Sequence, residues 1–259
     1  MEKEEQRNFR SSPAVFHSWL IVNTGGGDRG TRLRVAHLLQ MIDLHTHSIL
    51  SDGELLPSEL ARRALVKGYR IIGISDHADS SNLEMVITSM LHLRDRMEYY
   101  GHITILPGVE ITHAPIGLIA DLISDARKLG VLYVVVHGET LAEPVEEGTN
   151  HEAILGGVDI LAHPGLITRE DVRFARERGV LLEISARKGH SLANGHVARL
   201  AREEGADLIY DTDTHAPSDL TSEGEARKIV MGAGLSADDF TIMQNNALNL
   251  VKRAVEAVR

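Results

Sequence analysis

The sequence predicts one large α/β domain folded as a barrel, and three observations lead to this fold class. The chain has 259 residues with 43% apolar content, enough for one substantial core and short for two. From Met41 onward, short apolar segments alternate with helix-like segments at intervals of roughly 20–35 residues, the pattern of βα units and a parallel sheet. Histidine or acidic residues follow most of these apolar segments.

Seven strands are predicted from compact apolar runs. The clearest, residues 131–136, reads Val-Leu-Tyr-Val-Val-Val, as expected for a strand covered by helices on both faces. Seven such strands with helices between them indicate a barrel. The predicted strands span residues 41–45, 70–75, 103–109, 131–136, 158–162, 180–184 and 207–211.

Proline and glycine mark the ends of several helices between these strands. Pro57 can occupy the first turn of a helix, and Gly68 stands where a left-handed C-terminal cap is common. Gly130 and Gly205 are expected to end two more helices.

Later helices show weaker signals. Thr168 and Asp171 resemble a capping box before an apolar stripe, and Gly179 follows the helix that they would begin. The last helix is expected at about residues 247–258, where it closes the fold.

Residues 1–40 differ in composition from the rest of the chain. They hold six basic and four acidic residues and a Thr-Gly-Gly-Gly stretch, without sustained periodicity. Their opening residues are too polar for a secretory signal. We expect either a poorly ordered N-terminal extension or translated sequence upstream of a natural start at Met41, and favour the second. Residues 41–259 are then the barrel domain.

Composition excludes several classes of protein. Without cysteine there are no disulfides or thiolate sites, so any metal must be held by imidazole and carboxylate. The formal charge of −10 disfavours nucleic acid as a partner, since a basic stripe would be expected. No apolar run approaches the ~20 residues that span a bilayer, so no membrane partner is expected. The expected location is the cytoplasm, and the sequence leaves the oligomeric state open.

Eight histidine and acidic residues lie at or just beyond the ends of the predicted strands, and a ninth candidate, Asp52, lies in the loop after the first strand, where alone it would more often be a turn or helix-cap aspartate. In a parallel barrel the carboxyl ends of the strands meet at one face, so these side chains are expected to converge there. Nine ligands are too many for one cation, which implies two or three. The predicted ligands are His45, His47, Asp52, His77, Glu110, His137, His163, Asp213 and His215.

Two pairs in this set have informative spacing. His45 and His47 are two residues apart, so in an extended chain both imidazoles project to the same side and can bind one cation. Asp213 and His215 repeat this spacing. Either pair alone is a modest signal, and His137 or His163 alone would more often be a structural histidine. The joint placement after six of seven strands argues against coincidence.

These motifs resemble the PHP (polymerase and histidinol phosphatase) family of metal-dependent phosphoesterases. The resemblance covers residues 41–215, and it is specific as a combination although each motif alone is weak. It is carried by Asp43-Leu44-His45-Thr46-His47-Ser48, Ser51-Asp52-Gly53, Ser75-Asp76-His77, Pro107-Gly108-Val109-Glu110, Ala162-His163-Pro164-Gly165 and Asp211-Thr212-Asp213-Thr214-His215.

The resemblance implies a distorted (β/α)₇ TIM-like barrel with a trinuclear metal centre. It assigns His45, His47 and Asp213 to one ion, His137 and His163 to a second, and Glu110 to a bridge between them. It assigns the remaining three residues to a third ion: Asp52, His77 and His215. Some family members carry histidine where this chain has Asp52, and an oxygen ligand slightly favours manganese or iron over zinc.

The resemblance also implies an enzyme that hydrolyses a small phosphomonoester through metal-activated hydroxide, with Glu110 and Asp213 acting through that hydroxide. Candidate substrates are histidinol phosphate and other sugar or nucleotide phosphates. Arg187, Lys188 and His190 follow the sixth predicted strand and are candidates to bind the substrate, Arg187 as a bidentate phosphate ligand and Lys188 as a point charge. An ordinary solvated loop is the alternative interpretation of this segment.

Other residues near the predicted site are set apart from it. Asp76 would point to the opposite side of a regular strand from His77, so an outer or structural role is as consistent as a catalytic one. Glu139 is interpreted as a loop carboxylate, and His113 and His196 as non-ligands.

Three alternative functions remain open. An amidohydrolase also begins with two histidines after its first barrel strand, but it typically has a carboxylated lysine where this chain has His137. A nuclease or phosphodiesterase is disfavoured by the absence of a basic stripe. A non-enzymatic scaffold would be expected to have lost ligands, whereas all nine positions here are chemically competent.

Overall fold

The computed structural model describes residues 41–94, 96 and 102–257, and the prediction for residues 1–40 lies outside them. Seven parallel strands form one sheet in the order β1-β2-β4-β5-β6-β7-β8, so neighbours in the sheet follow one another along the chain. Together with a short eighth strand, β3, that pairs beside β4, the strands are β1 (Met41–Asp43), β2 (Tyr69–Ile74), β3 (His77–Ala78), β4 (Thr104–Ile111), β5 (Tyr133–His137), β6 (Ile160–Ala162), β7 (Leu181–Ser185) and β8 (Leu208–Asp211). All seven predicted strands are present.

Strand β3 is an additional element with two residues. It pairs in parallel with the end of β4 and sets His77 opposite Glu110. Because it is so short, its residues carry no strand periodicity, and the sequence predicted only the histidine after β2.

The barrel closes incompletely between β1 and β8. A single parallel bridge joins Thr46 to Thr214, where the His47 N–H donates to the Thr214 carbonyl at 2.8 Å. Side chains add further contacts across this seam, since the Asp211 carboxylate accepts the Leu44 N–H at 2.6 Å. The fold is therefore the distorted seven-stranded α/β barrel that the sequence predicts.

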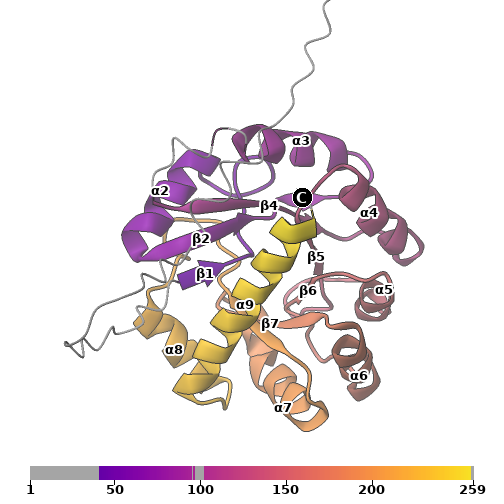
Figure 1. The fold of residues 1–259 in the computed structure, drawn as a ribbon. Helices are drawn as coiled ribbons and strands as arrows, with labels where there is room; N and C mark the ends of the chain where they lie inside the picture. Colours follow the sequence, from indigo (N-terminus) through magenta and orange to yellow (C-terminus); the bar gives the residue numbers. More distant parts are fainter. Residues whose placement is uncertain (1–40, 95, 97–101, 258–259) are drawn as a thin grey trace, which may run out of the picture. The chain divides into compact units, whose positions relative to one another are not determined.

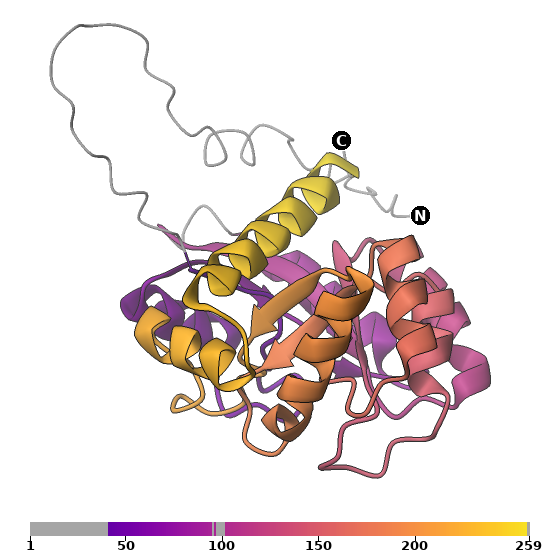
Figure 2. The same ribbon diagram turned by 90° about the horizontal axis from the view of Figure 1, so that it is seen from below.

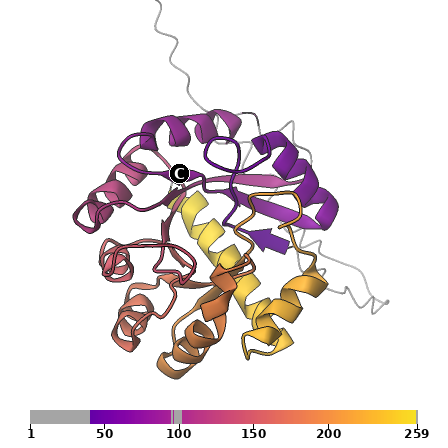
Figure 3. The same ribbon diagram turned by 180° about the vertical axis from the view of Figure 1, so that it is seen from behind.

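Helices surround the strands, as Figure 3 shows. Gly68 caps α2 with φ of 102°, and Thr168 caps α6 by accepting the Asp171 N–H, as predicted. None of the helices within the described ranges has the length and apolar character of a membrane span. The helices are α2 (Pro57–Lys67), α3 (Leu83–Arg94), α4 (Ile116–Lys128), α5 (Thr149–Leu155), α6 (Arg169–Arg178), the 3₁₀ helix η2 (His190–Ala193), α7 (Asn194–Glu204), α8 (Glu223–Gly232) and α9 (Ala237–Ala257).

Helix α9 is longer than predicted and begins at Ala237 rather than near residue 247. It lies across one end of the barrel (Figures 1 and 2). The buried Gln244 side chain accepts from the Ile42 N–H at 2.7 Å and donates to the Ile42 carbonyl at 3.0 Å. Polar residues such as Gln244 interrupt the apolar periodicity in the first half of α9, so the sequence did not predict a helix there. Because α9 contacts the start of β1, it leaves the carboxyl ends of the strands open.

Tyr133 fills the inside of the barrel between β2 and β4. It is fully buried, and its hydroxyl donates to the Leu44 carbonyl at 2.7 Å. Its ring needs glycine beside it, since a Cβ added to Gly73 or Gly108 would lie 2.1 Å or 2.2 Å from Tyr133 atoms. The glycines therefore admit a large side chain that supports β1 just before His45.

We expect Gly73→Ala to lower the free energy of unfolding by at least about 2 kcal/mol, because the added methyl group meets Tyr133 and the Leu44 backbone in a packed interior. Urea unfolding of the purified protein measures the change. Gly117→Ala in α4 is the matched control, since its Cβ would have no neighbour within 4 Å, and it should be neutral or slightly stabilising. Equal stability of the two variants would contradict the packing role of Gly73.

Candidate metal centre

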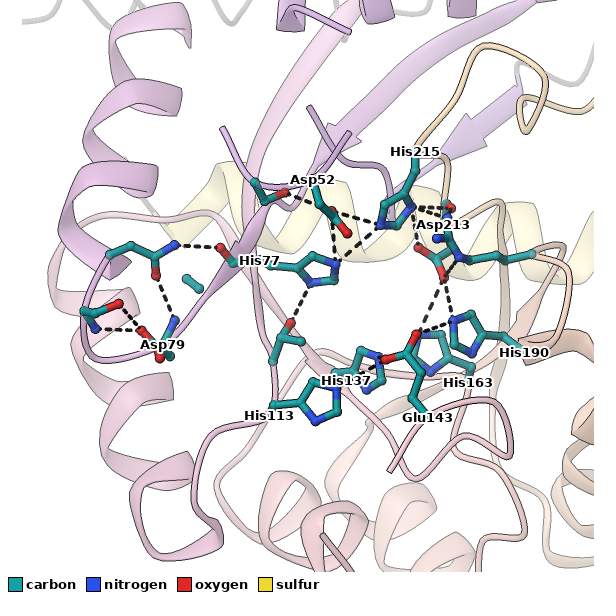
Figure 4. A pocket seen from close by; sticks show the side chains of 16 residues that line it. Asp52, His77, Asp79, His113, His137, Glu143, His163, His190, Asp213 and His215 are labelled. Atoms are coloured by element: carbon teal, nitrogen blue, oxygen red, sulfur yellow. Dashed lines mark hydrogen bonds and ion pairs between the residues drawn. The ribbon is translucent and has the colours of Figure 1, made fainter. Parts of the chain in front are cut away.

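The nine predicted ligands converge at the carboxyl ends of the strands, and Figure 4 shows most of them around one cavity. The cavity has a volume of about 460 Å³. Its lining includes six of the predicted ligands: Asp52, His77, His137, His163, Asp213 and His215. His45 and Asp213, which are 168 positions apart in the chain, are thus neighbours in the fold.

The first group of ligand atoms surrounds His45 and His47, whose side chains are both fully buried. The His45 Nε2 atom lies 3.3 Å from Glu110 Oε1 and 3.7 Å from Asp213 Oδ1. The His47 Nε2 atom lies 3.2 Å from Asp213 Oδ1 and 3.6 Å from Glu110 Oε2. Glu110 is therefore placed between the two histidines and Asp213.

A second group lies nearer the solvent and contains Asp52, His77 and His215. The Asp52 Oδ1 atom is 3.4 Å from His77 Nε2 and 3.1 Å from His215 Nε2, and the two nitrogens are 3.4 Å apart. His47 also presents a nitrogen within 4.8 Å of this group. The three residues that resemblance assigns to one ion are thus brought together.

A third group contains His137 and His163, which are both buried. The His163 Nε2 atom lies 3.7 Å from Asp213 Oδ2 and 3.9 Å from Glu110 Oε1. His190, whose ligand atom lies within 4.8 Å of those of His137 and His163, joins this group. Glu110 consequently contacts atoms of all three groups, because His77 Nδ1 is also 2.6 Å from its Oε2 atom.

The spacing of these atoms fits divalent cations. Two nitrogen or oxygen ligands of one ion lie about 3.0–3.6 Å apart when each is about 2.0–2.2 Å from the metal. Many of the distances above fall in this range, between nitrogens and oxygens that face each other. The Nε2 atom of His45 and both ring nitrogens of His47 are buried without a hydrogen-bond partner among the described residues. Unpaired buried nitrogens are costly unless a cation binds them.

The histidines differ in protonation: although burial favours the neutral form, neighbouring carboxylates raise the pKa of His45, His77 and His137, whereas the pKa of His47 and of His163 is lowered. Burial, and after it the charge of His77, lowers the pKa of His47 well below its usual value. Burial, and then the charge of His137, does the same to the pKa of His163. Both imidazoles are therefore held neutral, which is the form that coordinates metals.

The carboxylates show opposite shifts. Burial acts most strongly on Glu110 and would raise its pKa, yet His45 and His77 hold that pKa well below its usual range. Burial raises the pKa of Asp213 to about 7. A bound cation reverses such a shift, because it stabilises the ionised carboxylate. Asp213 is thus a carboxylate that needs positive charge beside it at neutral pH.

Two ligands sit in an unusual backbone conformation directly after their strands. His163 follows β6 with φ of 26°, and Asp213 follows β8 closely with φ of 52°. Positive φ is uncommon for residues with a Cβ and is found where surrounding structure fixes a functional side chain. Here it turns both side chains toward the cavity instead of along the strand.

Glu183 supports the site and was not predicted. It is buried in β7, its Oε1 atom lies 2.7 Å from His45 Nδ1, and its Oε2 atom accepts the His163 N–H at 2.7 Å. It therefore orients two ligands from beneath the cavity. Its position within an apolar strand, before the strand end, gave no sequence signal.

The residues set apart from the site have structural partners. Asp76 accepts the Ser48 N–H and hydroxyl, Glu139 accepts the N–H groups of Gly148 and Asn150, and the His196 ring donates to a backbone carbonyl. His113 lines the cavity, and its Nε2 atom lies 3.2 Å from Glu143. Glu143 itself lies in an acidic loop whose sequence gives no metal-binding pattern.

The three candidate substrate-binding residues are placed differently. Arg187 lines the cavity, donates to the Asp213 carbonyl at 3.0 Å and contacts His215. His190 is buried and also lines the cavity. Lys188 is exposed and does not line it.

Curated relatives and solved structures resemble this chain over most of its length. An uncharacterised protein of Methanocaldococcus jannaschii is 43% identical over 218 residues, which are 83% of this chain and 99% of that protein. A protein of a Thermoanaerobacter species named as a probable phosphatase is 28% identical and is covered over 88% of its length, against 76% of this chain.

Two solved structures share the fold at low sequence identity. A chain from archaeal ribonuclease P with mature tRNA has a TM-score of 0.62 at 15% identity, covering 83% of this chain and 91% of that one. Histidinol phosphate phosphatase of Lactococcus lactis, complexed with zinc, L-histidinol and phosphate, has a TM-score of 0.53 at 17% identity, covering 76% and 94%.

A sequence model of the PHP domain matches residues 43–204, more than half of the chain. This span contains seven of the nine predicted ligands, and the barrel carries the other two, Asp213 and His215, beside them. The resemblance drawn from the motifs is confirmed. The chain belongs to the PHP domain family.

Proposed function

We propose that the protein is a metal-dependent phosphoesterase that hydrolyses a small phosphomonoester. The observation that carries this proposal is the convergence of nine imidazole and carboxylate side chains, spaced as ligands, on one cavity. Membership of the PHP family and relatives named as probable phosphatases support the same reaction class.

The chain's own residues determine where a phosphate ester binds. When bound, divalent cations neutralise phosphate oxygens and lower the pKa of water toward ~7, which makes a nucleophile available at neutral pH. Glu110 would hold ions of neighbouring groups together, and Asp213 would share the group of His45 and His47. Arg187 presents its guanidinium at the cavity, where its N–H donors can contact a phosphate oxygen.

The cavity favours a small substrate over a polymer. A volume of about 460 Å³ lies in the range of sites for small molecules. Histidinol phosphate, which resembles the ligands of the Lactococcus lactis structure, and other sugar or nucleotide phosphates are the candidate substrates. A nuclease, phosphodiesterase or amidohydrolase remains the alternative outcome of the test below.

The test is a hydrolysis screen of the purified protein with manganese, iron or zinc supplied. The panel contains phosphomonoesters, phosphodiesters, single-stranded oligonucleotides and amides, and phosphate, nucleotide and ammonia release are measured separately. We expect phosphate release from a phosphomonoester, abolished by a chelator and restored by metal. Activity confined to diesters or amides, or unaffected by chelation, would refute the proposal.

Replacement of Arg187 tests the substrate contact. We expect Arg187→Ala to raise KM for the phosphomonoester by about 10- to 100-fold, because a charge-assisted hydrogen bond to phosphate is lost. Steady-state kinetics with the substrate found in the screen measures this change. Arg62→Ala on the exposed side of α2 is the matched control and should leave the kinetics unchanged. Unchanged KM in Arg187→Ala would reject the contact.

A further inference from the structure

The loop between β5 and α5, residues 138–148, brings a carboxylate to the third group of ligands. The Glu143 Oε2 atom lies 3.2 Å from His137 Nε2, and Figure 4 shows Glu143 beside His137 and His163. Hydrogen bonds join the two ends of the loop, because the Glu139 carboxylate accepts the N–H groups of Gly148 and Asn150. The Gly138 N–H donates to the Ala162 carbonyl at 3.0 Å and ties the start of the loop to the end of β6. Glu143 is thus held over the cavity by an anchored loop.

His190 faces the same point from β7's side of the barrel. Its Nδ1 atom lies 2.6 Å from the Thr140 hydroxyl, so its Nε2 atom is the one directed at the group. That Nε2 atom lies 3.5 Å from Glu143 Oε1 and 3.7 Å from Asp213 Oδ2. The His190 ring also stacks on His163 with centroids 4.0 Å apart. His190 is buried, and its orientation is fixed on two sides.

These contacts have the geometry of a cation site between the facing atoms. The His137 Nδ1 atom lies 3.2 Å from the Gly138 carbonyl, to which a neutral imidazole donates its one N–H. In the neutral form that binds metals, its Nε2 atom presents a lone pair to the Glu143 carboxylate, and a cation near both atoms removes that repulsion. The 3.2 Å and 3.5 Å separations match those of two ligands on one ion, about 3.0–3.6 Å.

We propose that Glu143 and His190 are further ligands of the cation that His137 and His163 hold. His113 then donates a hydrogen bond from its Nε2 atom to the Glu143 carboxylate, at a distance of 3.2 Å. This inference rests on the metal centre of the proposed function and not on its substrate. It replaces the sequence-based expectation that His190 binds substrate.

A separate ion held by His113, His137 and Glu143 is the competing arrangement, since their ligand atoms lie within 4.8 Å of one another, as those of His137, His163 and His190 do. His137 can give its Nε2 atom to one ion only, and its Nδ1 atom faces the Gly138 carbonyl. His163 and His190 are buried around that nitrogen, whereas the His113 side chain is 42% exposed. The buried group is the better site, because fewer water molecules compete for the ion.

If Glu143 binds this ion, metal binding stabilises the position of the loop of residues 138–148. With Glu143 bound to the ion, the tip of residues 138–148 is tied to the cavity, and without the ion the carboxylate loses the charge that holds it there. The tip of the loop is then held more firmly in the loaded protein than in the metal-free protein.

The test measures metal release from the holoprotein under a chelator, with zinc as the probe. We expect Glu143→Gln to release one class of ions about 10- to 100-fold faster than the unsubstituted protein, while the remaining ions leave at the unchanged rate. Glu147→Gln makes the same chemical change on an exposed side chain of the same loop and is the matched control. His190→Asn should reproduce the effect of Glu143→Gln.

Hydrogen exchange supplies a second readout that needs no activity. Metal loading should slow exchange in residues 139–147 of the unsubstituted protein and of Glu147→Gln, but much less in Glu143→Gln. Identical zinc release and identical exchange in Glu143→Gln and the unsubstituted protein would overturn this inference. Absence of bound metal in the purified and reconstituted protein would overturn it together with the metal centre. A Glu143-dependent ion in a protein without phosphatase activity would support the inference and refute the proposed reaction.

Discussion

Glu110→Gln is expected to abolish phosphomonoester hydrolysis, with kcat/KM reduced by at least about 10³-fold. Glu110 is fully buried, and its oxygens lie within 3.9 Å of nitrogens of His45, His47, His77 and His163. An amide of the same shape removes the negative charge that would join cations of neighbouring groups. Initial rates with the substrate from the screen, together with metal content by elemental analysis, measure the effect.

The same variant should retain the fold, because glutamine fills the volume of glutamate in a packed site. Circular dichroism and thermal unfolding of the metal-free proteins check this. Glu84→Gln, on the exposed surface of α3, is the matched control and should keep full activity. Full activity with a full complement of metal in Glu110→Gln would disprove the bridging role.

The position of the site could be predicted from sequence because two strong patterns coincide. Continuous apolar runs identify the strands. In a parallel barrel, the residues directly after each strand lie at the same face. His45, His137 and His163 therefore converge in the structure as their places in the chain predict. The spacing of His45 and His47 further predicted that both imidazoles point to the same side of the chain. In the structure both present a ring nitrogen to the same group of ligand atoms as Asp213.

Site residues that do not directly follow a predicted strand could not be identified from the sequence. Glu183 lies in the middle of β7. The apolar pattern predicts the strand around it, but ligands were sought only at the ends of strands. Glu143 lies in a loop with several glutamates, and only the folded path of that loop distinguishes it from Glu147. The turns at His163 and Asp213, with positive φ, likewise depend on tertiary packing and have no counterpart in local sequence preference.

Glu183 is the residue whose loss should damage stability and metal binding together. In Glu183→Ala the His163 N–H and the His45 Nδ1 atom lose their acceptors in a buried layer. We expect the free energy of unfolding of the loaded protein to fall by about 3–5 kcal/mol, as for removal of one partner from a buried ionic contact. Metal affinity should also fall by about 10- to 100-fold, because Glu183 holds the His45 ring through its Nδ1 atom and the His163 backbone through its N–H group. Urea unfolding and competition with a zinc chelator measure the two effects.

The Glu183→Gln variant separates orientation from charge. Glutamine keeps an acceptor for the His163 N–H but loses the negative charge beside His45, so its loss of stability should be smaller than that of Glu183→Ala while its metal affinity still falls. Glu177→Ala on the exposed surface of α6 removes a carboxylate whose ion pair with Arg176 is worth about 0–1 kcal/mol, and it controls for net charge. If Glu183→Ala matched Glu177→Ala in both measurements, the carboxylate beneath the cavity would have no part in holding His45 and His163 in place.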